Sequence, residues 1–290
     1  MCKQKERVIS AHVGMQTRRV VKNTVLYIVI GTGALTMLLP FIWMISSSLM
    51  TQAEMFYFPP KWIPKVLRWD NYVKTIQTMP FIRFTINTII ISVTSTFGML
   101  LVCSISAYTF ARMRFPGKPI IFGVLMTTMM IPNQVTMIPV FLIMRWLGWV
   151  NSFLPLIVPS FFGGAFGIFM LRQFHMTIPM ELEEAAKLDG CNRLRIIFQI
   201  MIPLTKPALA TLGVFTFMGK WNDLLGPVIY LYDFNKMTLT VGLAMFRTQY
   251  STVYNLLMCG AVISMLPILA IYVFAQKYFV QGIVMTGIKG

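Results

Sequence analysis

The chain has 290 residues, of which 57% are hydrophobic and only 12% are charged. A soluble domain carries about 25% charged residues, and a water-soluble core of this length could not bury so much apolar surface. A bilayer can act as the solvent for the outer face of such a chain. The net charge of +16 does not indicate nucleic-acid binding, because Lys and Arg lie between long apolar runs rather than on one face of a soluble domain.

Six apolar segments are long enough to cross a membrane, since a spanning helix needs roughly 20 apolar residues. They cover about residues 24–46, 86–111, 119–144, 152–171, 207–231 and 256–279. The sequence therefore predicts an all-α integral membrane protein with about six transmembrane helices. In this division a cytoplasmic N-terminal tail, the transmembrane domain and a cytoplasmic C-terminal tail occupy residues 1–23, 24–280 and 281–290.

Lys and Arg in the connections predict the orientation, because cytoplasmic loops carry an excess of both. Sixteen of them lie on the side of the two termini and eight on the other side. We therefore expect both termini in the cytoplasm and the chain in the plasma or inner membrane. The outer loops are then residues 47–83, rich in Pro and Trp and expected to be extended and partly interfacial, and residues 232–255, polar and aromatic.

The residue types of a metal or catalytic site do not gather anywhere in the sequence. The four cysteines form neither a CxxC motif nor a cluster with histidine, so no metal site and no disulfide framework is indicated. His12 and His175 are isolated and fall in segments expected to be cytoplasmic. No phosphate-binding loop is present, so we expect a transport subunit that needs no cofactor and has no ATPase site of its own.

The third predicted span is interrupted near its middle by Ile131-Pro132-Asn133-Gln134, and Pro139 follows. Proline removes a backbone donor and kinks a helix. One interpretation is a kink that serves packing. The other is a break that lines a pathway, as broken helices at mid-membrane often do, with Asn133 and Gln134 facing the substrate.

The fifth predicted span carries two charged residues, Lys220 and Asp223, which are three residues apart and can pair on a helix. Trp221 and Asn222 lie between them, and Gly226-Pro227 is expected to disrupt the helix. One interpretation is that these groups hold helices or subunits together. The other is that Lys220, Trp221, Asn222 and Asp223 line the pathway or form a gate, a set that would suit a sugar.

The cytoplasmic segment 177–207 is much longer than most helix connections in bundles, which have about 2–8 residues. It is predicted to form two short helices joined by a turn. Thr177 can cap the first helix, Pro179 fits its first turn, and Gly190 can end it with a positive φ.

The second of these helices can be capped by Asn192 and is expected to stop before Pro203. The exposed short helix and the turn have the form of a docking element for another protein.

The same segment resembles the EAA loop of ABC importer permeases. It has Glu184-Ala185-Ala186, three residues, Gly190, nine residues and then Ile200-Met201-Ile202-Pro203, with Ile202 where the family has Leu. The resemblance covers nearly the whole chain and is closest to the second permease subunit of maltose-type systems. Other stretches that support it are Asn71-Tyr72, Asn87-Thr88, Ala107–Arg112, Met130-Ile131-Pro132, Trp221-Asn222-Asp223 and Gly287–Gly290.

This resemblance implies partners as well as contacts. A second, homologous permease subunit, a pair of ATPase subunits and an extracytoplasmic solute-binding protein are expected, with membrane lipid around the helices and a sugar or oligosaccharide as solute. The residues implied to couple the chain to the ATPase are Glu184, Ala185, Ala186, Asp189, Gly190 and Pro203. The alternatives are a permease for a related solute such as glycerol phosphate, a membrane-embedded enzyme, or a stand-alone secondary transporter that uses Lys220 and Asp223 as a coupling pair.

Overall fold

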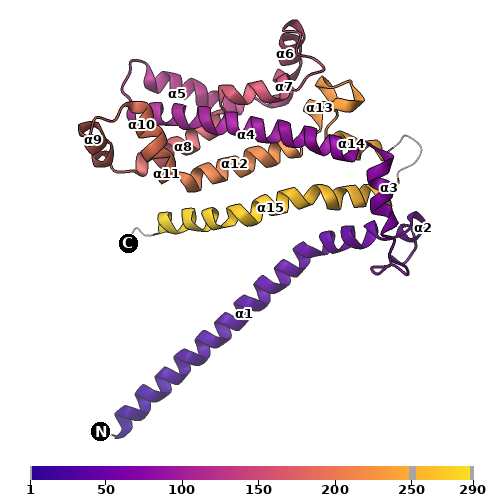
Figure 1. Cartoon of the computed structure of the whole chain (residues 1–290). Coiled ribbons are helices and arrows are strands. Elements are labelled where there is room, and N and C mark those ends of the chain that lie inside the picture. Colours follow the sequence, from indigo (N-terminus) through magenta and orange to yellow (C-terminus); the bar gives the residue numbers. More distant parts are fainter. Residues whose placement is uncertain (1, 248–252, 288–290) are drawn as a thin grey trace. The chain divides into compact units, whose positions relative to one another are not determined.

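A computed structural model describes residues 2–247 and 253–287, and helices make up nearly all the regular structure in that part of the chain (Figure 1). Among these residues, four helices are long and apolar enough to cross a membrane, and two bent helix pairs bring the candidate spans to six. Packing divides the chain into two compact units. One holds Met1–Tyr72 with Tyr254–Val262, and the other holds Val73–Val253 with Ile263–Gly290.

The first helix, α1 (Cys2–Ser48), joins the predicted N-terminal tail and the first predicted span without a break. Its apolar part, Val21–Ser48, meets the length and hydropathy of a span. The outer segment 47–83 that follows was expected to be extended, but it contains α2 (Gln52–Met55) and α3 (Asp70–Thr78). A capping box between Thr51 and Glu54 gives α2 its start.

Asn71 organises the end of α1. The last carbonyls of a helix have no partner within it, and the side-chain amide of Asn71 donates to the carbonyls of Ser48 (2.9 Å) and Met50 (2.8 Å). The hydroxyls of Ser48 and Tyr72 lie 2.8 Å apart, and the Cys259 thiol donates to the Ser48 carbonyl at 3.1 Å. This explains why an Asn-Tyr pair follows a Pro-rich loop.

The second unit is built around α4 (Phe81–Arg112), which packs along α8 (Ala165–Thr177) and α12 (Lys206–Trp221) (Figure 1). Small residues let these helices approach closely, as is common in membrane bundles. A Cβ placed on Gly167 would lie 2.8 Å from the Cys103 sulfur and 3.0 Å from a Leu212 methyl. The crossing therefore requires glycine at position 167.

The third predicted span is broken rather than kinked. It consists of α5 (Lys118–Thr127), η1 (Thr128–Met130) and α6 (Asn133–Trp146), and its two halves meet at 102°. Ile131 is extended (φ −83°, ψ 115°), which is the conformation that a following proline favours. Pro139 lies inside α6.

The fourth predicted span is longer than expected and begins with a break in regularity. It consists of α7 (Leu154–Ile157), η2 (Val158–Phe162) and α8, and it ends at Thr177 instead of Leu171. His175 consequently lies in the last turn of a spanning helix and not in a loop.

The fifth predicted span is divided in two. α12 ends at Trp221, three residues without helix follow, and α13 runs over Leu225–Tyr230. At 1.5 Å per residue α12 is about 24 Å long, which is shorter than the hydrocarbon layer of about 30 Å. Gly226-Pro227 was expected to disrupt the helix, but the break lies before these residues. Pro227 lies in the first turn of α13, a position that proline tolerates.

The remaining elements follow the expected order. The second outer loop holds η4 (Phe234–Lys236) and α14 (Leu239–Met245), and the sixth predicted span is α15 (Tyr254–Gly287) with Pro267 inside it. Tyr250 of this loop, the last three residues of the predicted C-terminal tail and the side chain of His12 lie outside the described part of the chain.

The close crossing at Gly167 gives a prediction about stability. Gly167→Ala should lower the melting temperature of the purified protein in detergent, because overpacking a tight contact typically costs about 1–3 kcal/mol. The control is Gly123→Ala in α5, where an added Cβ would meet nothing within 4 Å. We expect this control to keep or slightly raise the melting temperature, since Ala favours helix over Gly. Equal melting temperatures for the two variants would contradict the prediction.

Candidate functional site

The segment 177–207 contains the predicted pair of short helices, but its first helix begins differently from the prediction. The Thr177 hydroxyl donates to the Phe174 carbonyl within α8 (2.8 Å) and caps nothing beyond it. Ile178 and Pro179 are extended, and the first helix, α9 (Met180–Leu188), starts after Pro179. Pro179 restricts the residue before it to extended backbone, which explains why α8 ends there.

The turn after α9 agrees with the sequence. Gly190 has φ +79°, the left-handed region that favours glycine. The Asn192 side chain accepts a hydrogen bond from the Arg195 N–H at 2.8 Å and so caps the next helix. The α9 helix is therefore held at a fixed turn from the helix that follows.

The second helix runs past Pro203, contrary to the prediction. It consists of α10 (Arg193–Ile196), a π-helical segment η3 (Ile197–Met201) and α11 (Ile202–Leu204), and the chain bends by 83° before α12. Pro203 lies inside this continuous helix, directly after the π-helical segment. The helix ends at Leu204, and α12 begins at Lys206, just before Pro207.

The two faces of α9 differ. Glu181, Glu184, Ala185 and Leu188 are exposed, and their spacing places them on one side of the helix. Leu188 is 90% exposed. Of the other residues predicted to couple the chain to an ATPase, Asp189, Gly190 and Pro203 are also exposed, whereas Ala186 is buried.

Ala186 faces the body of the protein. It is 6% exposed and belongs to an apolar cluster with Tyr108 of α4 and residues of the second helix, namely Ile196, Ile197 and Met201. A larger side chain at position 186 would push α9 away from α4. The last alanine of the Glu-Ala-Ala motif therefore has a packing reason in this chain.

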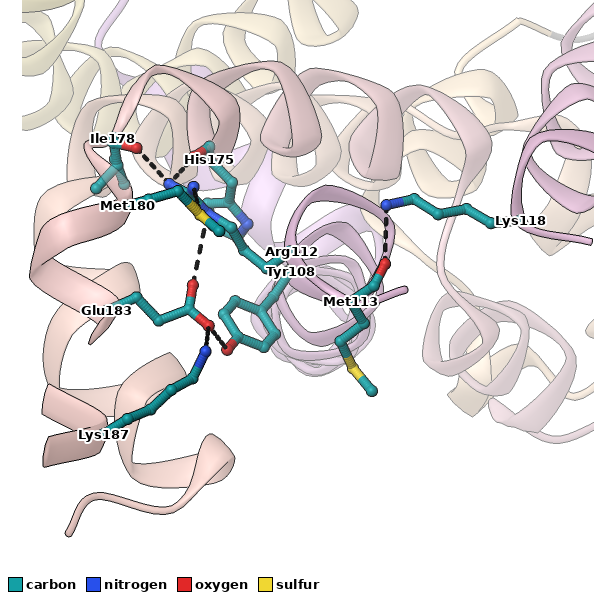
Figure 2. A network of polar contacts seen from close by, with 9 residues as sticks. All are labelled: Tyr108, Arg112, Met113, Lys118, His175, Ile178, Met180, Glu183 and Lys187. Carbon is teal, nitrogen blue, oxygen red and sulfur yellow. Dashed lines mark hydrogen bonds and ion pairs between the residues drawn. The ribbon is translucent and has the colours of Figure 1, made fainter. Parts of the chain in front are cut away.

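Glu183, next to the motif, is the buried acid of α9. Its Oε1 accepts hydrogen bonds from the Tyr108 hydroxyl (2.7 Å) and from Lys187 Nζ (2.9 Å). Its Oε2 lies 3.7 Å from Nε of Arg112, the last residue of α4. Figure 2 shows these side chains converging between α4 and α9. The contacts join the segment 177–207 to α4.

The Glu183 carboxylate is ionised at neutral pH. Burial alone would raise the pKa of Glu183, but hydrogen bonds from Lys187 and Tyr108 and the positive charges of Lys187 and Arg112 outweigh it and lower the pKa below the usual value of 4.5. Because the pKa is lowered on folding, this carboxylate stabilises the fold above pH 4.5, and that contribution is lost as the pH falls through the lowered value.

His175 lies beside this network. It is 1% exposed, and its ring centroid is 6.5 Å from that of Tyr108, in an edge-to-face arrangement. The expected segment is therefore helical at His175, which belongs to α8.

The residues predicted for a substrate pathway fall into two places. Asn133 and Gln134 open α6 and are exposed. The other four lie around the end of α12, and the charged pair expected there does not form. Lys220 Nζ donates instead to the Leu156 carbonyl (2.9 Å), while the Asp223 carboxylate accepts the Gly226 N–H (3.0 Å).

Pro159 explains the partner of Lys220. In a 3₁₀ segment each N–H bonds to the third preceding carbonyl, and Pro159, three residues after Leu156, has no N–H to give. The Leu156 carbonyl accepts instead from Lys220 and from the Ser95 hydroxyl (3.2 Å). The ammonium of Lys220 therefore joins α12 to the broken start of the fourth span.

Trp221 is part of the core. It is 2% exposed, stacks on Phe217 with ring centroids 5.5 Å apart, and donates from Nε1 to the Ser264 carbonyl (3.1 Å). In this structure the indole offers no open face to a solute. Asn222 is exposed, and its amide donates to the Met218 carbonyl at the end of α12 (3.0 Å).

Sequence reasoning missed a second polar cluster, which fastens the turn between α6 and α7 to the loop 232–255. Asn151 has φ 59°, and its Oδ1 accepts from the N–H groups of Tyr232 (3.1 Å) and Asp233 (3.0 Å). Its backbone carbonyl accepts from Lys236 Nζ (2.8 Å). Asn adopts positive φ more readily than most residues, and the Gly148-Trp149-Val150-Asn151 turn was the available signal.

A second asparagine fixes the same loop to α4. The Asn87 amide donates to the carbonyls of Asn235 and Met237, both at 2.9 Å, and Thr88 Oγ1 accepts the Leu239 N–H at 2.8 Å. The pair Asn87-Thr88, which carries part of the family resemblance, thus has a structural role. Among the side chains that the structure describes, no group of three or more His, Cys, Asp or Glu could hold a metal ion.

Comparison with known proteins gives a family and near relatives. Residues 99–285 match the family described as binding-protein-dependent transport system inner membrane component. The arabinooligosaccharides transport system permease protein AraQ of Bacillus subtilis (strain 168) is 32% identical over 228 residues, which cover 78% of this chain and 81% of that protein. The sulfoquinovosyl glycerol transport system permease protein SmoH of Agrobacterium fabrum is 28% identical over 254 residues, covering 87% and 89%.

A solved structure is similar over most of its length. A chain in the crystal structure of a bacterial ABC transporter involved in the import of the acidic polysaccharide alginate is 26% identical to this chain, with a TM-score of 0.78. The alignment covers 89% of this chain and 96% of that chain.

The left-handed turn at Gly190 gives a prediction about the segment 177–207. Gly190→Ala should open this turn more often, because a left-handed backbone costs a residue with a Cβ roughly 1–2 kcal/mol. We expect trypsin to cleave the purified protein at the flanking Lys187 and Arg193 about tenfold faster. Gly190→Asn is the matched control and should cleave at nearly the wild-type rate. Equal rates for Gly190→Ala and wild type would show that the turn bears no such constraint.

The Asn151 cluster gives a prediction about the outer loops. Asn151→Gly keeps the positive φ but removes the side-chain acceptor, so the N–H groups of Tyr232 and Asp233 should exchange with deuterium faster than in wild type. Asn151→Asp retains an acceptor oxygen and should leave their exchange unchanged. Mass spectrometry of peptides covering residues 230–237 measures both. Faster exchange in both variants, or in neither, would disprove the role of the Oδ1 acceptor.

Proposed function

The chain belongs to the family of binding-protein-dependent transport system inner membrane components and is a permease subunit of an ABC importer, and we propose that its exposed α9 face receives the motion of ATPase subunits. The family match and the relatives confirm the resemblance to ABC importer permeases. They also confirm the prediction of an all-helical membrane protein that acts as a transport subunit.

The proposed solute is a sugar or an oligosaccharide. The names of both relatives refer to sugar-containing solutes, and the structural neighbour belongs to an importer of a polysaccharide. In this proposal an extracytoplasmic binding protein delivers the solute, as the family description implies. The polar outer loops that Asn151 and Asn87 hold in place are the surface offered to that protein.

The observation that supports the ATPase contact is the exposed face of α9 within the segment that resembles the EAA loop. Glu184, Ala185 and Leu188, the last of them 90% exposed, form one continuous surface there, and we expect the partner to bury it. Asp189, Gly190 and Pro203 extend the exposed surface. Of the predicted coupling residues, Ala186 acts from the other side of the helix by fixing its distance from α4.

The proposed orientation follows from charge. We place the segment 177–207 and both termini in the cytoplasm, because the connections on that side carry twice as many Lys and Arg residues as those on the other. The residue ranges of the tails and of the transmembrane domain, 1–23, 24–280 and 281–290, are part of this proposal. On this proposed cytoplasmic side lie the C-terminal ends of α4 and α8, the helix α9, and the helix formed by α10, η3 and α11.

The proposed cycle uses partners that the resemblance implies. A second, homologous permease subunit completes the membrane pathway, and two ATPase subunits bind from the cytoplasm. ATP binding closes the ATPase pair, the two coupling segments move with it, and the bundle opens outward, a hinge or rigid-body transition of a common kind. Hydrolysis resets the bundle.

The residues proposed for the pathway are now of two kinds. Asn133, Gln134 and Asn222 have exposed amides that could bind hydroxyl groups of a sugar. Lys220, Trp221 and Asp223 are held by Leu156, Ser264 and Gly226, so they support the pathway from behind in this conformation. The stand-alone secondary transporter needs a Lys220–Asp223 pair, and the observed contacts do not favour it.

The test removes the apolar contact of α9. Leu188→Asp should abolish co-purification of the ATPase subunits with the tagged chain from its native host, because it places a charge where an apolar contact is proposed. The same purification shows whether the second permease subunit is bound. The wild-type complex is then placed in proteoliposomes, and its ATP-driven uptake of labelled oligosaccharides is measured.

The matched control is Leu67→Asp, a leucine that is 54% exposed in the outer segment 47–83. It should leave ATPase co-purification unchanged. If Leu188→Asp still retains the ATPase subunits, or if wild-type chain takes up solute without them, the proposed function is wrong.

A further inference from the structure

We propose that Glu183 is a positioning residue that locks α9 to the ends of α4 and α8, so that the three elements move as one body when the ATPase subunits move α9. This inference rests on the proposed function. It adds a route for the motion, from the exposed face of α9 through a buried carboxylate into two spanning helices.

The need for such a lock comes from the backbone. Only Ile178 and Pro179 connect α8 to α9, and both are extended (φ −77°, ψ 132° and φ −55°, ψ 140°). The backbone hydrogen bond from Ile178 to α8 is a long one, from its N–H to the His175 carbonyl (3.4 Å), and an extended two-residue link of this kind can act as a hinge. A push on α9 could then change the hinge angle and leave α8 where it is.

Arg112 crosses this hinge. Its Nη2 donates to the carbonyls of His175 (2.7 Å) and Ile178, at the end of α8, and its Nε lies 3.7 Å from the Glu183 carboxylate on α9. Figure 2 shows the guanidinium between these groups. One side chain from the end of α4 therefore contacts both sides of the link.

Arg172 completes the connection between the two spanning helices. It lies on α8, and its Nε donates to the Phe110 carbonyl near the end of α4 at 3.1 Å. Arg112 of α4 likewise donates to carbonyls at the end of α8. Each helix thus donates from an arginine to carbonyls at the C-terminal end of the other, and a cation at a helix C-terminus is also favoured by the helix dipole.

Glu183 connects α9 to this pair. The carboxylate accepts a hydrogen bond from the Tyr108 hydroxyl at 2.7 Å and faces Arg112. The side chains of Arg112 and Glu183 are only 6% and 5% exposed. Withdrawing two charges from water is costly, and apolar residues of similar size often stabilise a fold as well or better. A buried ion pair across a hinge therefore suggests a role in geometry more than in stability.

Glu183 and Glu184 therefore have different roles in this proposal. Glu184 is exposed and belongs to the surface offered to the ATPase, whereas Glu183 points back to Tyr108 and Arg112. A force on the outer face of α9 is passed through Glu183 without bending the link at Ile178 and Pro179.

The test uses the purified complex with its ATPase subunits in nanodiscs and compares hydrogen–deuterium exchange with and without ADP–vanadate. In wild type, peptides from residues 180–190 (α9), 105–113 (α4) and 172–178 (α8) should all respond to the nucleotide. In Glu183→Gln and in Tyr108→Phe, the α9 response should remain and the α4 and α8 responses should be lost or reduced severalfold. Glu183→Gln removes the negative charge that faces Arg112, and Tyr108→Phe removes the hydroxyl that donates to the carboxylate, so the double variant should lose at least as much of the α4 and α8 responses as either single variant.

Tyr108→Phe keeps the aromatic packing, so it decides the question if Glu183→Gln fails to assemble. Tyr27→Phe, which removes the hydroxyl of a tyrosine that is 73% exposed on α1, is the matched control and should respond like wild type. The proposal is overturned if Tyr108→Phe keeps all three responses, whether or not its melting temperature falls. A wild-type complex in which α9 does not respond would instead overturn the proposed ATPase contact.

Discussion

Unpaired backbone carbonyls at broken helices are the constraint on which the rest of this structure depends. In a membrane, a backbone group that leaves a helix must find a partner within the protein. Here polar side chains from other helices supply it: Asn71 for the end of α1, Arg112 and Arg172 for the ends of α8 and α4, and Lys220 for the carbonyl of Leu156. The charged residues of the bundle are therefore placed by the positions of the breaks.

The same constraint links structure to the proposed mechanism. Residues that cap helix ends lie where helices meet, so they join elements that are distant in sequence. At the end proposed to be cytoplasmic, Arg112 joins α4, α8 and α9. At the opposite end, Asn151 joins the turn after α6 to the loop 232–255, and Asn87 joins that loop to α4. α4 thus has a polar attachment at each end, and it connects the surface proposed for the ATPase with the surface proposed for the binding protein.

Sequence alone predicted those features that depend on local chemistry. The apolar runs gave the spans, the turn at Gly190 needed a residue free to adopt positive φ, and Asn192 was a recognisable cap. The tertiary partners could not be predicted in this way. Glu183 and Glu184 are adjacent and chemically identical, and Glu183 faces inward on the side of α9 where Ala186 packs against Tyr108, a contact between residues far apart in sequence. The sequence suggested that Lys220 pairs with its neighbour Asp223. Its partner in the structure, the Leu156 carbonyl, lies 64 residues away in sequence and could not be foreseen.

The contact between Lys220 and the carbonyl that Pro159 leaves free links the evolution of these two positions. The proline leaves a carbonyl without its helical donor, and the lysine, together with Ser95, compensates for that loss. Either residue alone would be a defect, since an N–H at position 159 would compete with the ammonium, and a missing ammonium would leave the carbonyl with one weaker donor. Homologous chains should therefore keep both residues or replace both. A chain that replaced only one of them would need a compensating substitution elsewhere in the bundle.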